Sequence, residues 1–207
     1  MNGIPIEFSK SLRNLGIIFD NPFSLHQNII QLKRISSIRH FLSVDATKTL
    51  MCSLVLSKLD YCNSLLSGSP QYLIQLFQKV QNTAAQITLR APRAEHTSPL
   101  LRSLHWLPVQ QRIKHKVCSI CYAILTGTSP KYMLELVNVY IPSRCLHSVL
   151  DSHTLTIPYV KTKICGQRSF AYQGPATWND LPFDLWHKDS LSTFKSAFIF
   201  FTSWLRL

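Results

Sequence analysis

The acidic residues of this 207-residue chain are the first candidates for catalytic chemistry. Two-metal phosphoryl transfer needs carboxylates gathered around ions about 3.5 to 4 Å apart, commonly with two adjacent acids on a tight turn. The chain has ten acids but no adjacent pair, and the closest two, Asp180 and Asp184, flank a predicted turn. We therefore expect no catalytic centre of this kind. Asp60, within the run Leu-Asp-Tyr-Cys at 59–62, is interpreted as a helix-side acid that pairs with Lys58 or a backbone amide.

Three possible zinc ligands, His115, Cys118 and Cys121, lie close together in the sequence. A closed zinc site needs a fourth ligand and usually a loop knuckle, whereas cysteines three residues apart within a predicted helix ordinarily fill a core. We expect no metal site and no cofactor. A cysteine nucleophile paired with His147 or His153 stays open from the sequence, although no neighbouring motif supports it.

A basic segment carries the strongest functional signal. Residues 79–116 hold seven cations and one acid, Glu95, for a local net charge of +6. Cations that meet phosphates give affinity for nucleic acid without sequence readout. Trp106, beside His105, has two interpretations: a stacking surface for single-stranded bases, or a core anchor beside a merely solvated basic face. The candidate nucleic-acid-binding residues are Lys79, Arg90, Arg93, Arg102, Trp106, Arg112, Lys114 and Lys116.

The elements that must position these side chains are predicted to be mainly helical. Apolar residues recur at helical spacing, and proline or glycine stands at the expected ends. A glycine, serine and proline at 68–70 predict a tight connection between two antiparallel helices. The expected helices cover residues 43–68, 70–92, 108–127, a short one from 129 to 137, and 191–205.

Outside these helices the pattern is less regular. A short apolar run at 15–19 predicts one isolated, buried strand, and residues 154–160 alternate as a strand does, with Pro158 favouring a sheet edge. The predicted fold class is therefore mainly α: a helical bundle with a short N-terminal strand and a less regular α+β C-terminal region. We expect two domains, 1–91 with the strand and first helices, and 92–207 with the basic and aromatic region.

Composition limits the classes of partner. Hydrophobic residues make up 46% of the chain, enough for a folded core, and the net charge is +12 with a pI near 9.7. That charge favours nucleic acid first and an anionic membrane surface second. No apolar run reaches the roughly 20 residues of a membrane span, and the first residues lack a secretory signal. We therefore expect no membrane partner, a nuclear or cytoplasmic protein, and reduced thiols at its six cysteines.

Six sequence blocks occur in an order that closely resembles the C-terminal third of the reverse transcriptase polyprotein of LINE-type (non-LTR) retrotransposons. The similarity runs from about residue 12 to about residue 196. Compared with the family, the chain is shorter by about two helical turns between residues 26 and 32, which suits a degenerate copy. The blocks read LGIIFD at 15–20, IRHFLS at 38–43, LDYCNSLLSG at 59–68, VQNTAA at 80–85, LHWLPV at 104–109 and WNDLP at 178–182.

The resemblance implies a piece that lies downstream of a polymerase active site. The helices from residue 43 to residue 90 are similar to the family's thumb, which grips template and primer, and the basic region after them is post-thumb. The paired aspartates of the palm and the endonuclease are not among the matching blocks. The resemblance thus implies a non-catalytic fragment of an RNA-directed DNA polymerase that binds RNA or DNA. The alternative is a remnant or interaction module without nucleic-acid function, and apolar surfaces that once met the palm predict self-association.

Overall fold

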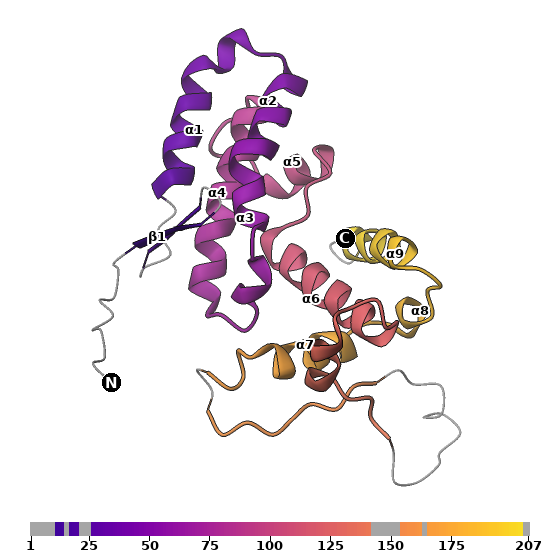
Figure 1. Ribbon diagram of the computed structural model, residues 1–207. Helices are drawn as coiled ribbons and strands as arrows, with labels where there is room; N and C mark the ends of the chain where they lie inside the picture. Colours follow the sequence, from indigo (N-terminus) through magenta and orange to yellow (C-terminus); the bar gives the residue numbers. More distant parts are fainter. Residues whose placement is uncertain (1–10, 15–16, 21–25, 142–153, 163–164, 205–207) are drawn as a thin grey trace, which may run out of the picture. The chain divides into compact units, whose positions relative to one another are not determined.

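The computed structural model describes residues 11–14, 17–20, 26–141, 154–162 and 165–204 (Figure 1). The chain divides into two compact units. The first unit comprises Met1–Tyr61 and Gln75–Leu104, and the second comprises Cys62–Ile74 and His105–Leu207. This division does not follow the domain boundary predicted after residue 91.

Helices make up most of both units. The first unit contains β1 (Ser11–Asn14), β2 (Ile17–Asp20), α1 (His26–Ile38), the 3₁₀ turn η1 (Arg39–Phe41), α2 (Val44–Met51), the π-helical η2 (Cys52–Leu56), α3 (Ser57–Asp60), the greater part of α4 (Gln71–Leu89) and α5 (Thr97–Ser103). The second contains η3 (Asn63–Leu66), the start of α4, α6 (Val109–Leu125), η4 (Lys131–Leu136), α7 (Phe170–Asn179), α8 (Phe183–Trp186) and α9 (Leu191–Trp204). The prediction of a mainly helical fold is confirmed.

The two predicted β features differ from the structure. The expected isolated strand at 15–19 is not supported, because β2 pairs with β1 in an antiparallel hairpin. The α+β description of the C-terminal region is wrong for the part that the structure describes, where only a single bridge joins Val139 to Leu155. The side-chain amide of Asn179 donates to the Leu155 carbonyl and accepts from its N–H, both at 2.9 Å. These groups are therefore satisfied without a neighbouring strand.

The segment from α2 to α3 forms one continuous helix that ends earlier than predicted. The hydroxyl of Ser43 accepts from the Ala46 N–H at 3.2 Å and so caps the start. The helix ends at Asp60, well before Gly68, because Tyr61 is extended with ψ 123° and Cys62 follows in a left-handed backbone with φ 52°. The prediction of a longer helix was wrong because this change in backbone conformation occurs at residues other than glycine, so the sequence does not mark it.

The π-helical turn η2 lies in the middle of this helix. Four buried residues recur at intervals of four: Thr47, Met51, Val55 and Leu59. In a regular α-helix a spacing of four advances about 40° per step, so such a row drifts around the helix. The wider turn of η2 reduces that drift and helps to keep the row on the core side.

Arg39 joins the turn η1 to the end of α4. Its side chain is only 7% exposed and donates from Nε to the Ile87 carbonyl at 2.9 Å, from Nη2 to the Thr88 carbonyl at 2.8 Å, and from Nη1 to the Leu42 carbonyl at 2.6 Å. Ile87 and Thr88 lie in the last turn of α4, where carbonyls have no helical partner. Burial lowers the pKa of Arg39, and the nearby charge of Arg90 lowers it further. The guanidinium still stays charged and acts as a C-terminal cap.

Arg90 ends α4 in a conformation that normally favours glycine. Its φ is 56°, its N–H donates to the Ile87 carbonyl at 3.4 Å, and the Ala91 N–H donates to the Gln86 carbonyl at 3.0 Å. This pair of bonds is a Schellman motif, and Gly127 closes α6 with the same pattern at φ 68°. The arginine therefore occupies a position where its Cβ strains the backbone.

The second unit packs around α6. Trp178 of α7 and Phe194 and Phe198 of α9 are almost completely buried. The ring of Tyr122, on α6, stacks on Phe194 with centroids 4.8 Å apart, and Trp178 stacks on Phe194 at 5.8 Å. Aromatic pairs of this geometry add stability beyond the area they bury. The aromatic C-terminal residues thus form the core around α6.

Replacing Arg39 with alanine should destabilise the first unit. We expect Arg39→Ala to lower the free energy of unfolding by about 3 kcal/mol, because carbonyls at the end of α4 lose charged donors in a buried place. Urea unfolding followed by far-UV circular dichroism measures the change.

The control is Arg34→Ala, since Arg34 is exposed on α1. Its effect should stay within about 0.5 kcal/mol of wild type. Equal unfolding midpoints for the two variants would contradict the capping role of Arg39.

Replacing Arg90 with glycine should stabilise the first unit by about 0.5 to 1 kcal/mol. Glycine relieves the strain of the positive φ and keeps both backbone bonds of the Schellman motif. It also removes the Arg90 charge, which repels the charged guanidinium of Arg39. Arg90→Ala is the matched control, because it also removes the charge but keeps the Cβ. Equal thermal midpoints for the glycine and alanine variants would show that the backbone is unstrained.

Candidate nucleic-acid interface

The candidate cations of the first unit lie at different positions along α4 and α5. Lys79 is exposed and lies opposite the buried face of α4, eleven residues before Arg90, so their backbones are about 16 Å apart along the helix. Arg102 is exposed in the last turn of α5. Lys79 is therefore a separate contact point from the cations at the end of α4.

Arg90 and Arg93 come together at the C-terminal end of α4. Both are exposed. The Nη2 of Arg90 donates to the Arg39 carbonyl at 3.4 Å, and the side-chain amide of Gln86 donates to the Arg93 carbonyl at 3.3 Å. The first bond joins Arg90 to the turn η1, and the second holds the loop after α4 against the end of that helix. The structure thus groups two of the predicted cations at one helix end.

The three cations of α6 do not share one face. Half-buried Arg112 and exposed Lys116 are one turn apart, and Arg112 donates from Nε to the Leu107 carbonyl at 2.8 Å. Lys114 lies about 200° around the helix from Arg112, is half-buried, and affects the pKa of the buried Cys118 thiol. Arg112 and Lys116 are therefore placed to meet a phosphate together, whereas Lys114 is not on their face.

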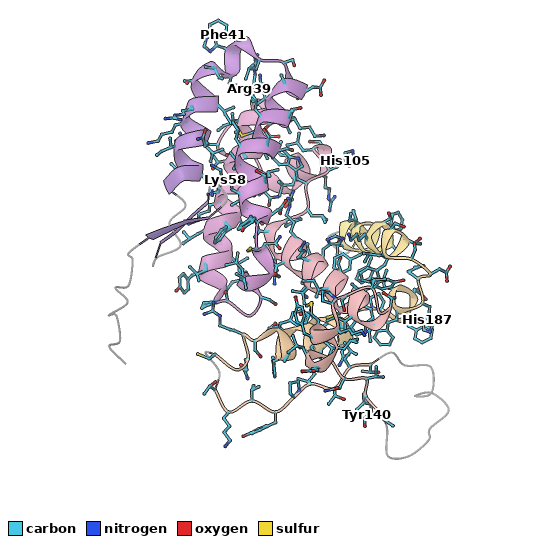
Figure 2. All side chains as sticks on the ribbon, in the orientation of Figure 1. Arg39, Phe41, Lys58, His105, Tyr140 and His187 are labelled. Carbon is cyan, nitrogen blue, oxygen red and sulfur yellow. The ribbon has the colours of Figure 1, made fainter. Side chains whose placement is uncertain are left out.

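Trp106 belongs to the core. It is only 6% exposed, while its neighbour His105 is exposed with φ 57° (Figure 2). Its burial favours the core-anchor interpretation over base stacking. Trp106 is therefore removed from the candidate interface, because a buried ring has no open face on which a base can stack.

The acids in the part of the chain whose side chains are described are all exposed. Asp60 is the last residue of α3, as expected for a helix-side acid. Within the described residues, no three His, Cys, Asp or Glu side chains lie close enough to hold a metal ion. The exposed acids are Asp45, Asp60, Glu95, Glu135, Asp180, Asp184 and Asp189.

The predicted zinc ligands of α6 lie in the interior. Cys118 and Cys121 are fully buried, and the Cys118 thiol donates to the Thr177 carbonyl at 3.8 Å. His115 packs edge-on against Phe198 with ring centroids 5.3 Å apart. Burial raises the pKa of the Cys121 thiol to about 12 and raises that of Cys118 strongly. Both are therefore neutral thiols at physiological pH. His147 and His153, the partners considered for a cysteine nucleophile, lie outside the described residues.

Sequence reasoning missed the aromatic pair of the turn η1. Phe41 is 80% exposed and its ring lies beside that of His40, with centroids 3.8 Å apart. The only signal in the sequence was the block at 38–43, where a phenylalanine follows arginine and histidine. Because an isolated phenylalanine normally predicts burial, its exposure could not be inferred from the sequence.

Comparisons with known proteins leave the class of this chain open. No protein-family model, curated protein or solved structure matches it. In the described residues, no helix has both the length and the apolar character to span a bilayer.

The buried thiols predict a loss of stability in alkali. The pKa of both is raised on folding, so their contribution is complete below the unfolded value of about 8.5 and is lost as pH rises toward their folded values. We expect each thiol to account for about 2 kcal/mol of lost stability by about pH 10. Urea titrations at a series of pH values measure this slope, which should flatten in the Cys118→Ala/Cys121→Ala variant.

Thiol labelling gives an independent check. Native protein should react with iodoacetamide at Cys62 and Cys165, which are exposed, while Cys118 and Cys121 react only after unfolding. Peptide mapping by mass spectrometry distinguishes them. Rapid native labelling of Cys121 would contradict the buried environment.

Proposed function

We propose that this chain is a non-catalytic fragment of a LINE-type retrotransposon RNA-directed DNA polymerase that binds RNA or DNA template-primer through the phosphate backbone. The resemblance of six ordered sequence blocks supports the family origin. The mainly helical fold is compatible with a thumb-like bundle in the first unit and a post-thumb region after it.

The observation that carries the binding proposal is the unbalanced charge of the first unit. Residues 28–61 and 75–104 hold nine cations and three acids. Most of the cations are exposed, and only Arg39 is buried. Such a surface attracts a polyanion and releases its counterions on binding. This term is independent of sequence, so the proposed interface recognises phosphates rather than bases.

In this proposal the cations act at three places. Arg90 and Arg93 meet the backbone at the end of α4, Lys79 meets it further along the same helix, and Arg112 with Lys116 forms a separate contact on α6. Arginine suits this role because its planar fork can donate two bonds to one phosphate. Trp106 has no part in the contact.

The absence of polymerase activity belongs to the same proposal. It rests on the sequence, which has no adjacent acids to hold two divalent ions. Primer extension on a primed RNA or DNA template, with magnesium or manganese, tests this directly. Any templated product made by these residues would refute the non-catalytic assignment.

A second candidate is an interaction module or remnant with no nucleic-acid function. Exposed apolar side chains favour it: Tyr132 is 71% exposed and Tyr159 is 90% exposed. Surfaces of this kind also predict self-association. A monodisperse monomer in sedimentation velocity, together with salt-dependent oligonucleotide binding, would argue against this alternative.

Salt dependence is the quantitative prediction of the electrostatic proposal. If about five cations meet phosphates, as proposed, affinity for an oligonucleotide should fall about five-hundredfold between about 50 and about 200 mM salt. Arg93→Gln and Lys116→Gln should each weaken binding and reduce the slope of log K against log salt by about 1. Fluorescence anisotropy with RNA and DNA oligonucleotides measures both quantities.

The matched control is Lys195→Gln, an exposed lysine on α9 outside the proposed contacts. It should leave the salt slope unchanged. Unchanged anisotropy of wild-type protein at about 50 mM salt would end the binding proposal.

A further inference from the structure

The turn η1 presents a phenylalanine to solvent. Phe41 is 80% exposed, and Figure 2 shows its side chain projecting beyond the ribbon at the turn between α1 and α2. The turn is nevertheless well anchored, because the Arg39 side chain before it is buried and bonded to carbonyls of α4. Phe41 is therefore an exposed ring on a fixed support.

His40 extends this surface. Its ring is exposed and lies beside Phe41, with centroids 3.8 Å apart and planes inclined by 42°. A phenyl ring and an imidazole offer flat faces that any nucleic-acid base can stack on, without hydrogen-bond readout. The pair presents more aromatic surface than Phe41 alone.

A cation lies next to the same turn. The Nη2 of Arg90 donates to the carbonyl of Arg39, the residue just before the aromatic pair. Arg93 is held near the same helix end through the bond from Gln86 to its carbonyl. Aromatic and cationic groups thus meet at one end of the first unit, which is the combination that single-strand binding surfaces use.

We propose that His40, Phe41 and Arg90 form a subsite for single-stranded nucleic acid. One unpaired base stacks on Phe41, with His40 alongside, and the adjoining phosphate meets Arg90. This inference rests on the proposed function and adds to it a preference for single strands, because a base paired within a duplex has no free face to stack on the ring.

The charge around the turn favours a polynucleotide over a lipid surface. The turn does expose further apolar groups, Ile38 at 45% and Val44 at 46%. However, Asp45 follows at once in the first turn of α2 and is exposed. Insertion of the turn η1 into a bilayer would bring the Asp45 carboxylate against anionic headgroups. Stacking of one base on Phe41 leaves that carboxylate in water.

The test uses the full chain and three substitutions of Phe41. Fluorescence anisotropy at about 50 mM salt measures binding to oligothymidylate and oligouridylate of about 16 nucleotides, and to a duplex of the same length. Phe41→Ala and Phe41→Leu should each weaken single-strand binding about tenfold, and Phe41→Trp should keep it. Duplex binding should change less than twofold in all three.

Phe41→Leu is the decisive variant because it keeps an exposed apolar group and loses only the aromatic face. Tyr159→Ala, which removes an exposed ring elsewhere, is the matched control and should bind as wild type does. Far-UV circular dichroism and the thermal midpoint confirm that each variant is folded.

The outcomes separate this inference from the proposed function. If single-strand affinity of Phe41→Leu equals wild type while Arg93→Gln still weakens binding, the subsite is wrong and the electrostatic proposal stands. If wild-type protein binds no oligonucleotide, both are overturned. A third outcome is that the wild-type protein co-sediments with phosphatidylserine vesicles, and that Phe41→Ala abolishes this while Phe41→Leu does not. The turn η1 then binds a membrane, and the subsite is overturned.

Discussion

The first unit depends on a positive charge buried at the end of a helix. The guanidinium of Arg39 donates to the carbonyls of Ile87, Thr88 and Leu42. The Ile87 and Thr88 carbonyls carry the negative end of the α4 dipole, so they stabilise a cation that would otherwise be expensive to bury. Because one side chain bonds both the η1 turn and α4, the turn cannot move independently of the helix end. The position of the exposed aromatic pair follows from this constraint.

The same helix end concentrates strain and charge. Arg90 adopts the left-handed backbone that glycine adopts at the end of α6, and its guanidinium adds repulsion to buried Arg39. Both effects oppose folding. A strained residue of this kind persists only where the surrounding structure compensates for it, here through the Schellman bonds and the Arg39 contacts. Neither the backbone conformation nor the charge of Arg90 is therefore explained by stability.

The helix boundaries could be predicted from the sequence where a proline or glycine marks the end of a helix. Helices α4 and α6 were predicted well because Pro70, Pro92, Pro108 and Gly127 mark their limits. The helix from 43 ends earlier than predicted because Tyr61 is extended and Cys62 is left-handed, with no glycine at either position, and α5 was missed because it is only seven residues long. Of the site, exposed cations could be predicted from type alone. The burial of Arg39 and the exposure of Phe41 could not, since both reverse the usual preference and depend on tertiary contacts.

Binding and catalysis make different demands on such a chain. Attraction between exposed cations and phosphates decreases slowly over several ångströms, so it tolerates contacts divided among several separate side chains. A two-metal centre tolerates no such division, because its carboxylates must converge within a few ångströms and be held there. Where side chains are described, the acids are exposed and dispersed, while the charge imbalance of the first unit comes from side chains that need no precise alignment. In the proposed function, affinity for a polyanion resides in such exposed cations, and the aromatic pair at η1 is the proposed place where that affinity gains a preference for unpaired bases.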